Sequence, residues 1–167
     1  NRGECLRVRT YKVVLWGFRT EYDYFRKYFE VEQLKGNMQI VAIVLNEFQL
    51  FQKVDGIDVV GMEVISSLEY DYIINMNQKA SAEVAKILQL LQIPQENVIP
   101  ARVFALPFFD LQRWVQVKES NISIISSHCW GGFAYNTLGL PFRSPFINMF
   151  FDNKEFLKML EDIEEYM

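Results

Sequence analysis

Short apolar runs alternate with segments of helical period through the first part of this chain, and this alternation constrains the fold more than any other feature. The longest runs are Tyr11–Trp16, Met38–Leu45 and Asp71–Asn75, whose aliphatic, β-branched and aromatic residues are typical of strands buried on both faces. Asp58–Val60 and Asn97–Ile99 predict two further, shorter strands. Such strands need helices on both faces, so we predict an α/β fold with a Rossmann-like, mainly parallel sheet and right-handed crossovers.

The segments between the runs supply the helices of this fold. Glu21–Leu34 carries aromatic residues near a helical period, and Glu63–Leu68 predicts a helical turn. A further helix is expected to start at Ser81, which is an N-cap candidate, and to end at Ile93 before a proline. We expect this Rossmann-like domain to occupy residues 1–116.

An aromatic cluster follows the last predicted strand. Pro107 is placed to begin a helix, because a proline is tolerated in the first helical turn. The aromatic side chains around it are expected to seal the join to the next part of the chain: Phe104, Phe108, Phe109 and Trp114.

Charge and composition narrow the classes of partner. The 167 residues are half hydrophobic, and 17 basic against 21 acidic residues give a net charge of -4. This balance argues against nucleic acid or an anionic membrane as the partner and leaves a small-molecule ligand. No apolar run approaches the roughly 18 residues of a membrane span, and no secretory leader is visible, so we predict a cytoplasmic protein without a membrane span.

The cysteines and the single histidine give no metal or disulfide framework. Cys5 and Cys129 lie far apart and form no CxxC pair, which is compatible with a reducing compartment. One histidine beside one cysteine does not supply the four ligands of a structural zinc site. The sequence therefore predicts no metal centre.

The turn after the first strand holds only part of a dinucleotide fingerprint. Gly17 supplies the first glycine, but the second and third are missing. Glu47 follows the second strand at about the place where a carboxylate would bind a ribose diol. Arg19 would meet a phosphate at a helix N-terminus, or it is a solvent-facing charge. We therefore name Gly17 and Arg19 as ligand-binding candidates and leave the cofactor unknown.

Residues Tyr11–Trp114 resemble small Rossmann-like modules that occur in bacterial enzymes and accessory proteins of surface-sugar metabolism. The resemblance rests on the Trp16-Gly17 turn and on the strand that begins Asp71-Tyr72. Many modules of this kind bind no cofactor, so the resemblance implies the fold and leaves the ligand open.

A second candidate site lies in Asn121–Gly132, with the sequence NISIISSHCWGG. Ile122, Ile124 and Ile125 predict a buried strand, and open α/β sheets bind ligands at the carboxyl ends of their strands. We expect residues 117–167 to be the N-terminal, truncated part of a second α/β domain that carries this loop.

Three side chains of the loop are candidates for catalysis. Cys129 precedes a helix predicted from about Gly131 to Leu138, whose positive end would lower the thiol pKa and make a nucleophile. The alternative is a buried, inert thiol. His128 and Cys129 are adjacent on an extended segment and should point apart, whereas Ser126 should lie nearer to His128.

Other residues of this region are candidates for ligand binding. The backbone N–H groups of Trp130, Gly131 and Gly132 could bind an oxyanion or a phosphate. Alternatively, Trp130 caps the core and the glycines form a tight turn. Arg143 could bind a phosphate or carboxylate, or it anchors a loop through carbonyl oxygens.

Beyond this loop, residues 152–167 predict a packing helix with Asp152 or Asn153 as N-cap and a solvated acidic face.

Ile122–Phe151 resembles the core of an uncharacterised bacterial family described as exopolysaccharide or capsule biosynthesis proteins. The residues that carry the resemblance are the Cys-Trp-Gly-Gly turn, Tyr135, Leu138–Leu140 and Arg143–Pro145. The resemblance implies a role in surface-polysaccharide biosynthesis.

Two functional hypotheses follow. In the first, the protein is a transferase of acyl, phosphoryl or glycosyl groups, with its site at the HCWGG loop (His128–Gly132) and a nucleotide-sugar or acyl donor as its ligand. In the second, it is a non-catalytic ligand-binding or scaffold protein with a degenerate Rossmann-like domain. The sequence leaves the reaction and the oligomeric state open.

Overall fold

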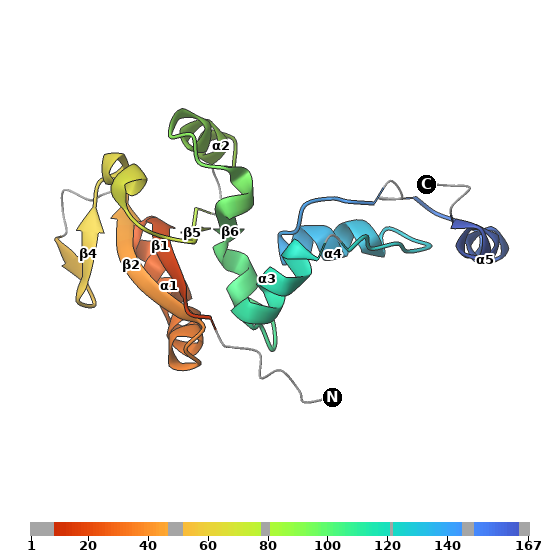
Figure 1. Cartoon of the computed structure of the whole chain (residues 1–167), viewed down its shortest axis with the longest axis horizontal. Helices are drawn as coiled ribbons and strands as arrows, with labels where there is room; N and C mark the ends of the chain where they lie inside the picture. The colour runs from red at the N-terminus through yellow and green to blue at the C-terminus, as the bar shows by residue number, and fades with distance from the viewer. Residues whose placement is uncertain (1–8, 47–51, 78–80, 121, 145–148, 164–167) are drawn as a thin grey trace. The chain divides into compact units, whose positions relative to one another are not determined.

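The chain forms two compact units, which divide between Arg113 and Trp114 (Figure 1). The computed structural model describes residues 9–46, 52–77, 81–120, 122–144 and 149–163. The first unit contains a six-stranded sheet with helices around it. The boundary predicted between residues 116 and 117 stays a prediction.

The sheet confirms the predicted Rossmann-like layout. Its strand order is β3-β4-β2-β1-β5-β6, and every pair is parallel except β3 with β4. Since β2 and β1 are neighbours while the chain then crosses to β5 on the far side of β1, the winding reverses at β1. The strands are β1 (Tyr11–Gly17), β2 (Met38–Leu45), β3 (Lys53–Val54), β4 (Ile57–Val60), β5 (Tyr72–Asn75) and β6 (Val98–Pro100).

The hairpin of β3 and β4 was not predicted from the sequence, although its turn carries a clear signal. Asp55 and Gly56 both have positive φ, at 50° and 79°. That pair of angles is typical of a type I′ turn, for which Asp-Gly is a favoured sequence. The hairpin adds an antiparallel edge to the sheet, which places Asp55 beyond the last parallel strand.

Two apolar layers cover the sheet. One layer contains side chains of β1, β2 and β5 together with those of η2 (Met62–Ser67) and α2 (Ser81–Leu90). On the other face, α1 (Arg19–Leu34) and η4 (Ala101–Ala105) pack together, with the Phe29 and Phe104 rings 5.2 Å apart and nearly perpendicular. The double coverage explains why the strands read as nearly continuous apolar runs.

Two helix ends differ from the predicted ones. α2 begins at Ser81 as predicted but ends at Leu90, because Gln92 adopts a positive φ of 54° and the Ile93 N–H turns back to the Leu88 carbonyl at 2.9 Å. α3 (Leu111–Glu119) begins four residues after Pro107, where a helix start was predicted.

The real start of α3 is set by Phe108 and Asp110. Phe108 has a positive φ of 57°, which is incompatible with a right-handed helix, so the helix begins after it. Its side chain is fully exposed and therefore does not take part in the predicted aromatic cluster. Asp110 then accepts a hydrogen bond from the Arg113 N–H at 3.1 Å, which is the contact that an N-cap residue makes.

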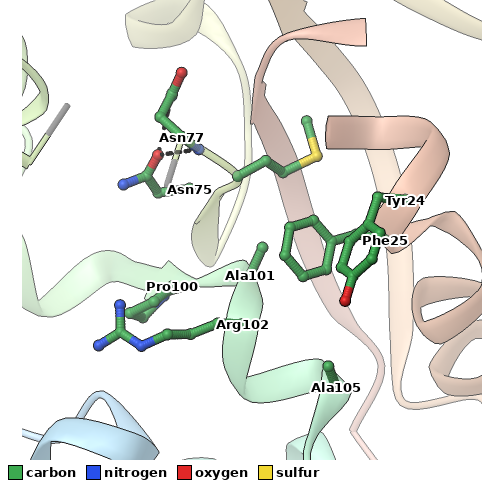
Figure 2. A pocket seen from close by; sticks show the side chains of 9 residues that line it. Tyr24, Phe25, Asn75, Asn77, Pro100, Ala101, Arg102 and Ala105 are labelled. Carbon is green, nitrogen blue, oxygen red and sulfur yellow. Dashed lines mark hydrogen bonds between the residues drawn. The ribbon is translucent and has the colours of Figure 1, made fainter. Parts of the chain in front are cut away.

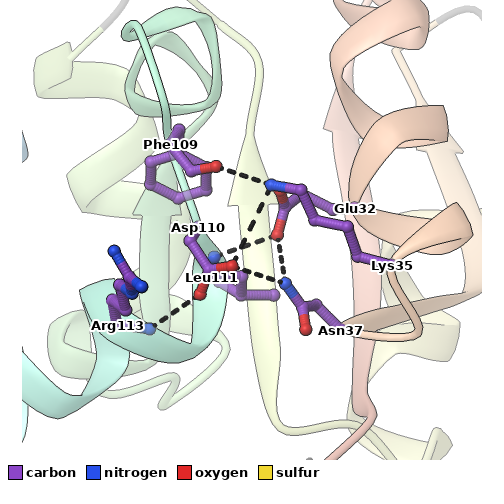
Figure 3. A network of polar contacts seen from close by, with 7 residues as sticks. All are labelled: Glu32, Lys35, Asn37, Phe109, Asp110, Leu111 and Arg113. Carbon is purple, nitrogen blue, oxygen red and sulfur yellow. Dashed lines mark hydrogen bonds and ion pairs between the residues drawn. The ribbon is translucent and has the colours of Figure 1, made fainter.

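A buried carboxylate joins α1 to the start of α3 (Figure 3). Glu32 is only 2% exposed, and its carboxylate accepts hydrogen bonds from Lys35 Nζ at 2.6 Å, Asn37 Nδ2 at 2.8 Å and the Leu111 N–H at 2.9 Å. Lys35 also donates to the Phe109 carbonyl at 2.8 Å. This network satisfies the charge of Glu32 and fixes the chain that follows η4.

The second unit is helical in its described residues. It contains the larger part of α3, α4 (Trp130–Leu138) and α5 (Asn153–Glu161), which Asp152 caps through the Lys154 N–H at 2.8 Å. α4 ends as predicted at Leu138, and Gly139, whose φ is 61°, is its C-cap.

The strand predicted at Ile122–Ile125 is wrong, because the structure forms none there. A strand needs a neighbour for its ladder of hydrogen bonds, whereas the Ile124 N–H donates to the Tyr135 hydroxyl at 2.8 Å and Ile122 is exposed.

Candidate functional site

A cavity of about 410 Å³ opens at the carboxyl ends of β5 and β6 (Figure 2). It lies beside β1, where the winding of the sheet reverses, and this is the place where open α/β sheets bind ligands. Its volume falls in the range of small-molecule sites. We call this cavity the crevice. The residues that line it are Tyr24, Phe25, Asn75, Met76, Asn77, Pro100, Ala101, Arg102 and Ala105.

Asparagines at the ends of neighbouring strands are joined by hydrogen bonds beside the crevice. Asn46, directly after β2, accepts from Trp16 Nε1 at 3.3 Å and donates through Nδ2 to Asn77 Oδ1 at 3.2 Å. Asn77 in turn donates through Nδ2 to Asn75 Oδ1 at 3.0 Å (Figure 2). The amides are therefore oriented before any ligand arrives.

Asn75 lines the crevice, and its amide is oriented by Asn77. Its Oδ1 accepts from both the backbone N–H and the Nδ2 of Asn77, each at 3.0 Å. An amide has one acceptor and one donor end, so this pairing leaves Nδ2 as the end of Asn75 that points away from Asn77 (Figure 2). Asn75 is the last residue of the buried strand β5, and an amide at the end of a buried strand was the sequence signal that could have marked this site.

The first turn is closed by side chains of the protein itself. A Cβ built on Gly17 would lie 2.8 Å from the Met76 Cβ and 3.0 Å from Glu21 Oε2. Glu21 also accepts a hydrogen bond from the Phe18 N–H at 3.0 Å and so occupies the N-terminus of α1. The glycine is required by this close packing, and a carboxylate already stands where the predicted phosphate would bind.

Arg19, the other predicted ligand-binding residue of this turn, is paired within its own helix. Its guanidinium lies 3.0 Å from the Asp23 carboxylate and above the Tyr22 ring, with its carbon 5.6 Å from the ring centroid. Glu47, the candidate for a ribose diol, lies outside the described residues, as does Cys5.

A second hollow of about 280 Å³ lies under the β3–β4 hairpin. There the Tyr22 hydroxyl donates to Asp55 Oδ2 at 2.9 Å, and Arg26 Nη1 donates to the same oxygen at 3.0 Å. Burial, with the Asp55 carboxylate adding to it, raises the pKa of Tyr22 above its ordinary value. These contacts join the hairpin turn to α1, and Tyr22, Arg26 and Asp55 in the lining are paired with one another.

In the second unit, Ser126 is committed to the backbone of the HCWGG loop. Its Oγ accepts from the Gly131 N–H at 2.8 Å, and its hydroxyl donates to the His128 carbonyl. A Cβ on Gly131 would lie 3.0 Å from this Oγ. Ser126 therefore satisfies the N-terminus of α4, and one of the three N–H groups expected to bind an oxyanion already has a partner.

The histidine ring meets a different serine. Ser127 Oγ lies 2.7 Å from His128 Nδ1, and the imidazole packs edge-on against Phe150 with centroids 5.9 Å apart. Sequence reasoning placed Ser126 nearest to His128 and did not name Ser127. Cys129 stands at the N-cap of α4 and is half-buried.

The remaining predicted residues of the second unit occupy different environments. Trp130 is 74% exposed, whereas Gly131 and Gly132 are buried. Arg143 Nη2 donates to the Lys118 carbonyl at 3.4 Å in the last turn of α3. A cation there favours the helix end, and this contact matches the loop-anchoring alternative.

The possible metal ligands and the apolar character of the helices also bear on the site. Within the described ranges, no group of three or more histidine, cysteine, aspartate or glutamate side chains is arranged to hold a metal ion. Among the helices that the structure describes, none combines the length and apolar character that a bilayer crossing requires.

Comparisons with known proteins match both parts of the chain to uncharacterised families. A family model described as "C2185-like, N-terminal" matches residues 9–99, and one described as "Domain of unknown function (DUF1919)" matches residues 101–167. An uncharacterized protein of Haemophilus influenzae is 36% identical over 61 residues, which make up 35% of this chain and 30% of that relative. The match thus spans less than a third of the relative's length.

Proposed function

Because this chain belongs to the C2185-like N-terminal family over residues 9–99, we propose that its Rossmann-like unit is a binding module for a small molecule seated in the crevice. The observation that carries the proposal is the cavity at the carboxyl ends of β5 and β6, next to the reversal of winding at β1. A parallel sheet gathers the ends of its strands at one edge, so this position collects polar groups from several strands.

The polar groups of the crevice support binding because their geometry is fixed in advance. The hydrogen bonds of Asn46, Asn75 and Asn77 hold the amides at the strand ends. A ligand that binds oriented groups loses less free energy to side-chain ordering than one that binds mobile groups. By contrast, the Gly17 turn is filled by Met76 and Glu21, so the proposed ligand does not use the pyrophosphate position of a dinucleotide site.

The cellular setting is a wider proposal. The resemblance of Ile122–Phe151 to proteins described as exopolysaccharide or capsule biosynthesis proteins supports a role in bacterial surface-polysaccharide biosynthesis, in the cytoplasm, with a nucleotide-sugar or acyl donor as the ligand. The activity of the whole protein is also a proposal, because its match to the H. influenzae relative covers 30% of that protein.

Backbone amide shifts of the full chain test the binding proposal. The protein is labelled with ¹⁵N and titrated with a panel of neutral, anionic and cationic metabolites. We expect at least one compound to shift the amides of Asn75, Asn77 and Ala101 in a saturable manner while those of the hairpin residues Asp55 and Gly56 stay in place. If every compound leaves the crevice amides unmoved, or moves only other regions, the proposal fails.

A transferase with its centre at the HCWGG loop is the second candidate, and the Ser127–His128 pair favours it. A hydroxyl 2.7 Å from an imidazole nitrogen is within the reach of a general base, and Cys129 lies next to this pair at a helix N-terminus. Cys129 and Ser127 are then alternative nucleophiles, and Arg143, Trp130 and Gly132 would border the ligand.

The pH dependence of alkylation separates the two candidates. In a Cys5→Ala variant of the full chain, iodoacetamide labelling of Cys129 is followed by mass spectrometry. Labelling at pH values well below the ordinary range of a thiol, with a midpoint that shifts in His128→Gln, would support the transferase. If Cys129 is labelled only in the ordinary pH range of a thiol, and the labelling midpoint is the same in His128→Gln, a catalytic role for Cys129 is contradicted.

A further inference from the structure

We propose that the crevice selects a phosphorylated ring compound, with the phosphate bound by Asn75 and Arg102 and the ring packed against Tyr24. This inference rests on the proposed binding function and adds the chemical class of the ligand. It follows from the donors, the aromatic face and the absence of carboxylates among the described lining residues.

The donor end of the crevice suits an anion. Asn75 holds its acceptor oxygen on Asn77, so its Nδ2 is the end that a ligand can meet. Arg102 is in η4, directly after β6, and adds a guanidinium to the same cavity. Amide and guanidinium N–H groups bind phosphate oxygens, and hydrogen bonds to a charged partner are stronger than neutral ones.

The opposite end presents aromatic surface. Tyr24 and Phe25 come from α1 and line the cavity, and Figure 2 shows them across the view from Asn75 and Arg102. Tyr24 is 55% exposed, and its ring lies edge-to-face against Phe25 at 4.9 Å. A ring of the ligand can cover this exposed face, where a base would stack or a sugar would place its C–H groups.

The charges of the lining residues also favour an anionic ligand. The described residues around the cavity include Arg102 and no aspartate or glutamate. The chain as a whole carries a net charge of -4, so a cavity with a cation and no carboxylate stands apart from the average surface. An anionic ligand gains more from this arrangement than a neutral one, and a cationic ligand would be repelled by the guanidinium.

Calorimetric titration of the full chain tests the proposal with named probes. Uridine 5′-monophosphate and glucose 1-phosphate represent the two kinds of ring, uridine and glucose are their uncharged counterparts, and inorganic phosphate is the minimal probe. We expect at least one phosphorylated compound to bind about tenfold or more tightly than both its uncharged counterpart and inorganic phosphate. The tighter of the two identifies the ring as a base or a sugar.

Substitutions of Asn75 and Arg102 test whether these residues bind the phosphate. Asn75→Asp keeps an oxygen that accepts from Asn77, but it replaces the donors by a second oxygen and adds a negative charge, so it should weaken binding of the phosphorylated compound about tenfold or more, and more than binding of the uncharged one. Arg102→Gln should act in the same direction. Asn97→Asp and Arg113→Gln repeat these charge changes outside the crevice lining and should leave affinity unchanged.

The ring is tested at Tyr24. Tyr24→Phe keeps the aromatic face and should retain the affinity for the phosphorylated compound. Tyr24→Leu removes the face and should bring that affinity toward the affinity for inorganic phosphate, which itself should not change.

Three outcomes would overturn the inference. They are equal binding of charged and uncharged compounds, full affinity in Asn75→Asp, and no binding of any phosphate probe. If the amide titration still finds another crevice ligand, the binding function survives and only the ligand class is wrong. If no compound of any charge reaches the crevice amides, both fail.

Discussion

The crevice and the HCWGG loop differ in what orients their polar side chains. The crevice asparagines lie at or just after the ends of strands β2 and β5, whose backbones are hydrogen-bonded to β1. In the loop, the side-chain contacts of Ser126 and Ser127 run to residues at most five positions away, whereas the Ser127 carbonyl accepts from the Phe151 N–H at 2.9 Å. The strands that carry the crevice asparagines are therefore fixed by long-range pairing, and the serine side chains of the loop by local hydrogen bonds.

This difference shows when a polar residue after an apolar run marks a site. Asn75 follows a run that pairs into the sheet, so its position is set by neighbouring strands. Ser126 follows Ile122–Ile125, a similar run that forms no strand in the structure. The two runs look alike in sequence, and only the partners available to the backbone distinguish them.

Removal of the Glu32 carboxylate should have the largest effect on the first region. Glu32→Ala leaves the Lys35 ammonium, the Asn37 amide and the Leu111 N–H without their buried acceptor, so we expect a loss of about 3 kcal/mol in the free energy of unfolding of the first unit. Amide hydrogen exchange of β1 and β5 measures this loss directly.

Glu30→Ala, on the same helix, is the matched control. Glu30 pairs only with Arg26 in the described residues, and both side chains are about half exposed, so its removal should leave exchange in β1 unchanged. Equal effects of the two substitutions on hydrogen exchange would show that the Glu32 network does not stabilise the first unit.

The cost of adding a methyl group at a glycine tests how closely side chains pack around the first turn and around the HCWGG loop. Gly17→Ala places a Cβ 2.8 Å from the Met76 Cβ, where no rotamer change of Met76 relieves the clash, so we expect a loss of about 2 kcal/mol. Gly131→Ala meets first the Ser126 hydroxyl at 3.0 Å, which can rotate, so its cost should be about 1 kcal/mol or less. Urea denaturation of both variants, followed by circular dichroism, ranks them, and the reverse order would contradict the comparison.

The sequence predicts most of the first region and much less of the second. The strands and α1 follow from apolar runs and helical spacing, because burial on both faces leaves a strong pattern. The crevice amides were missed, because the hydrogen bond that joins Asn46 to Asn77 spans 31 positions and depends on tertiary geometry that local spacing does not encode. The Asp55-Gly56 hairpin was missed despite its turn signal, and the end of α2 depended on the left-handed conformation of Gln92.

For the second region, the helix limits of α4 were predictable and the side-chain partners were not. Gly139 marks the end of α4 in the sequence as it does in the structure. The partner of His128 depended on rotations within three consecutive residues, which alternation along an extended segment predicts incorrectly once the segment bends. The site assignments of Ser126, His128, Cys129 and Arg143 stay predictions.

Alkaline pH should loosen the hairpin of the first region before it affects the rest of that unit. The pKa of Tyr22 is raised by burial and by Asp55, so the folded state holds a proton that the unfolded state releases near pH 10. The Tyr22 contribution is complete below that pH and falls as the pH rises above it.

Tyr22→Phe separates this effect from general alkaline unfolding. The variant loses the hydroxyl that donates to Asp55, at a cost of about 1.5 kcal/mol at neutral pH, and its stability should then fall less between neutral pH and pH 11 than that of the wild type. Tyrosinate absorbance adds a second measurement, since Tyr22→Phe should remove the absorbance change that the wild type shows only at strongly alkaline pH. A variant with the same pH dependence as the wild type would contradict the assignment.

The smallest expected effect is the difference between Ser126 and Ser127 in how much each hydroxyl stabilises α4. Ser126→Ala removes the acceptor of the Gly131 N–H at the start of α4, so we expect a loss of about 1 kcal/mol in the second unit, measured by hydrogen exchange of α4. Ser127→Ala removes a hydroxyl whose side-chain partner is the exposed His128 ring, so it should leave α4 exchange unchanged while altering the NMR signal of the imidazole. If Ser127→Ala instead destabilises α4, the hydroxyl–imidazole pair is part of the scaffold, and the loop loses the one contact that sets it apart from a helix cap.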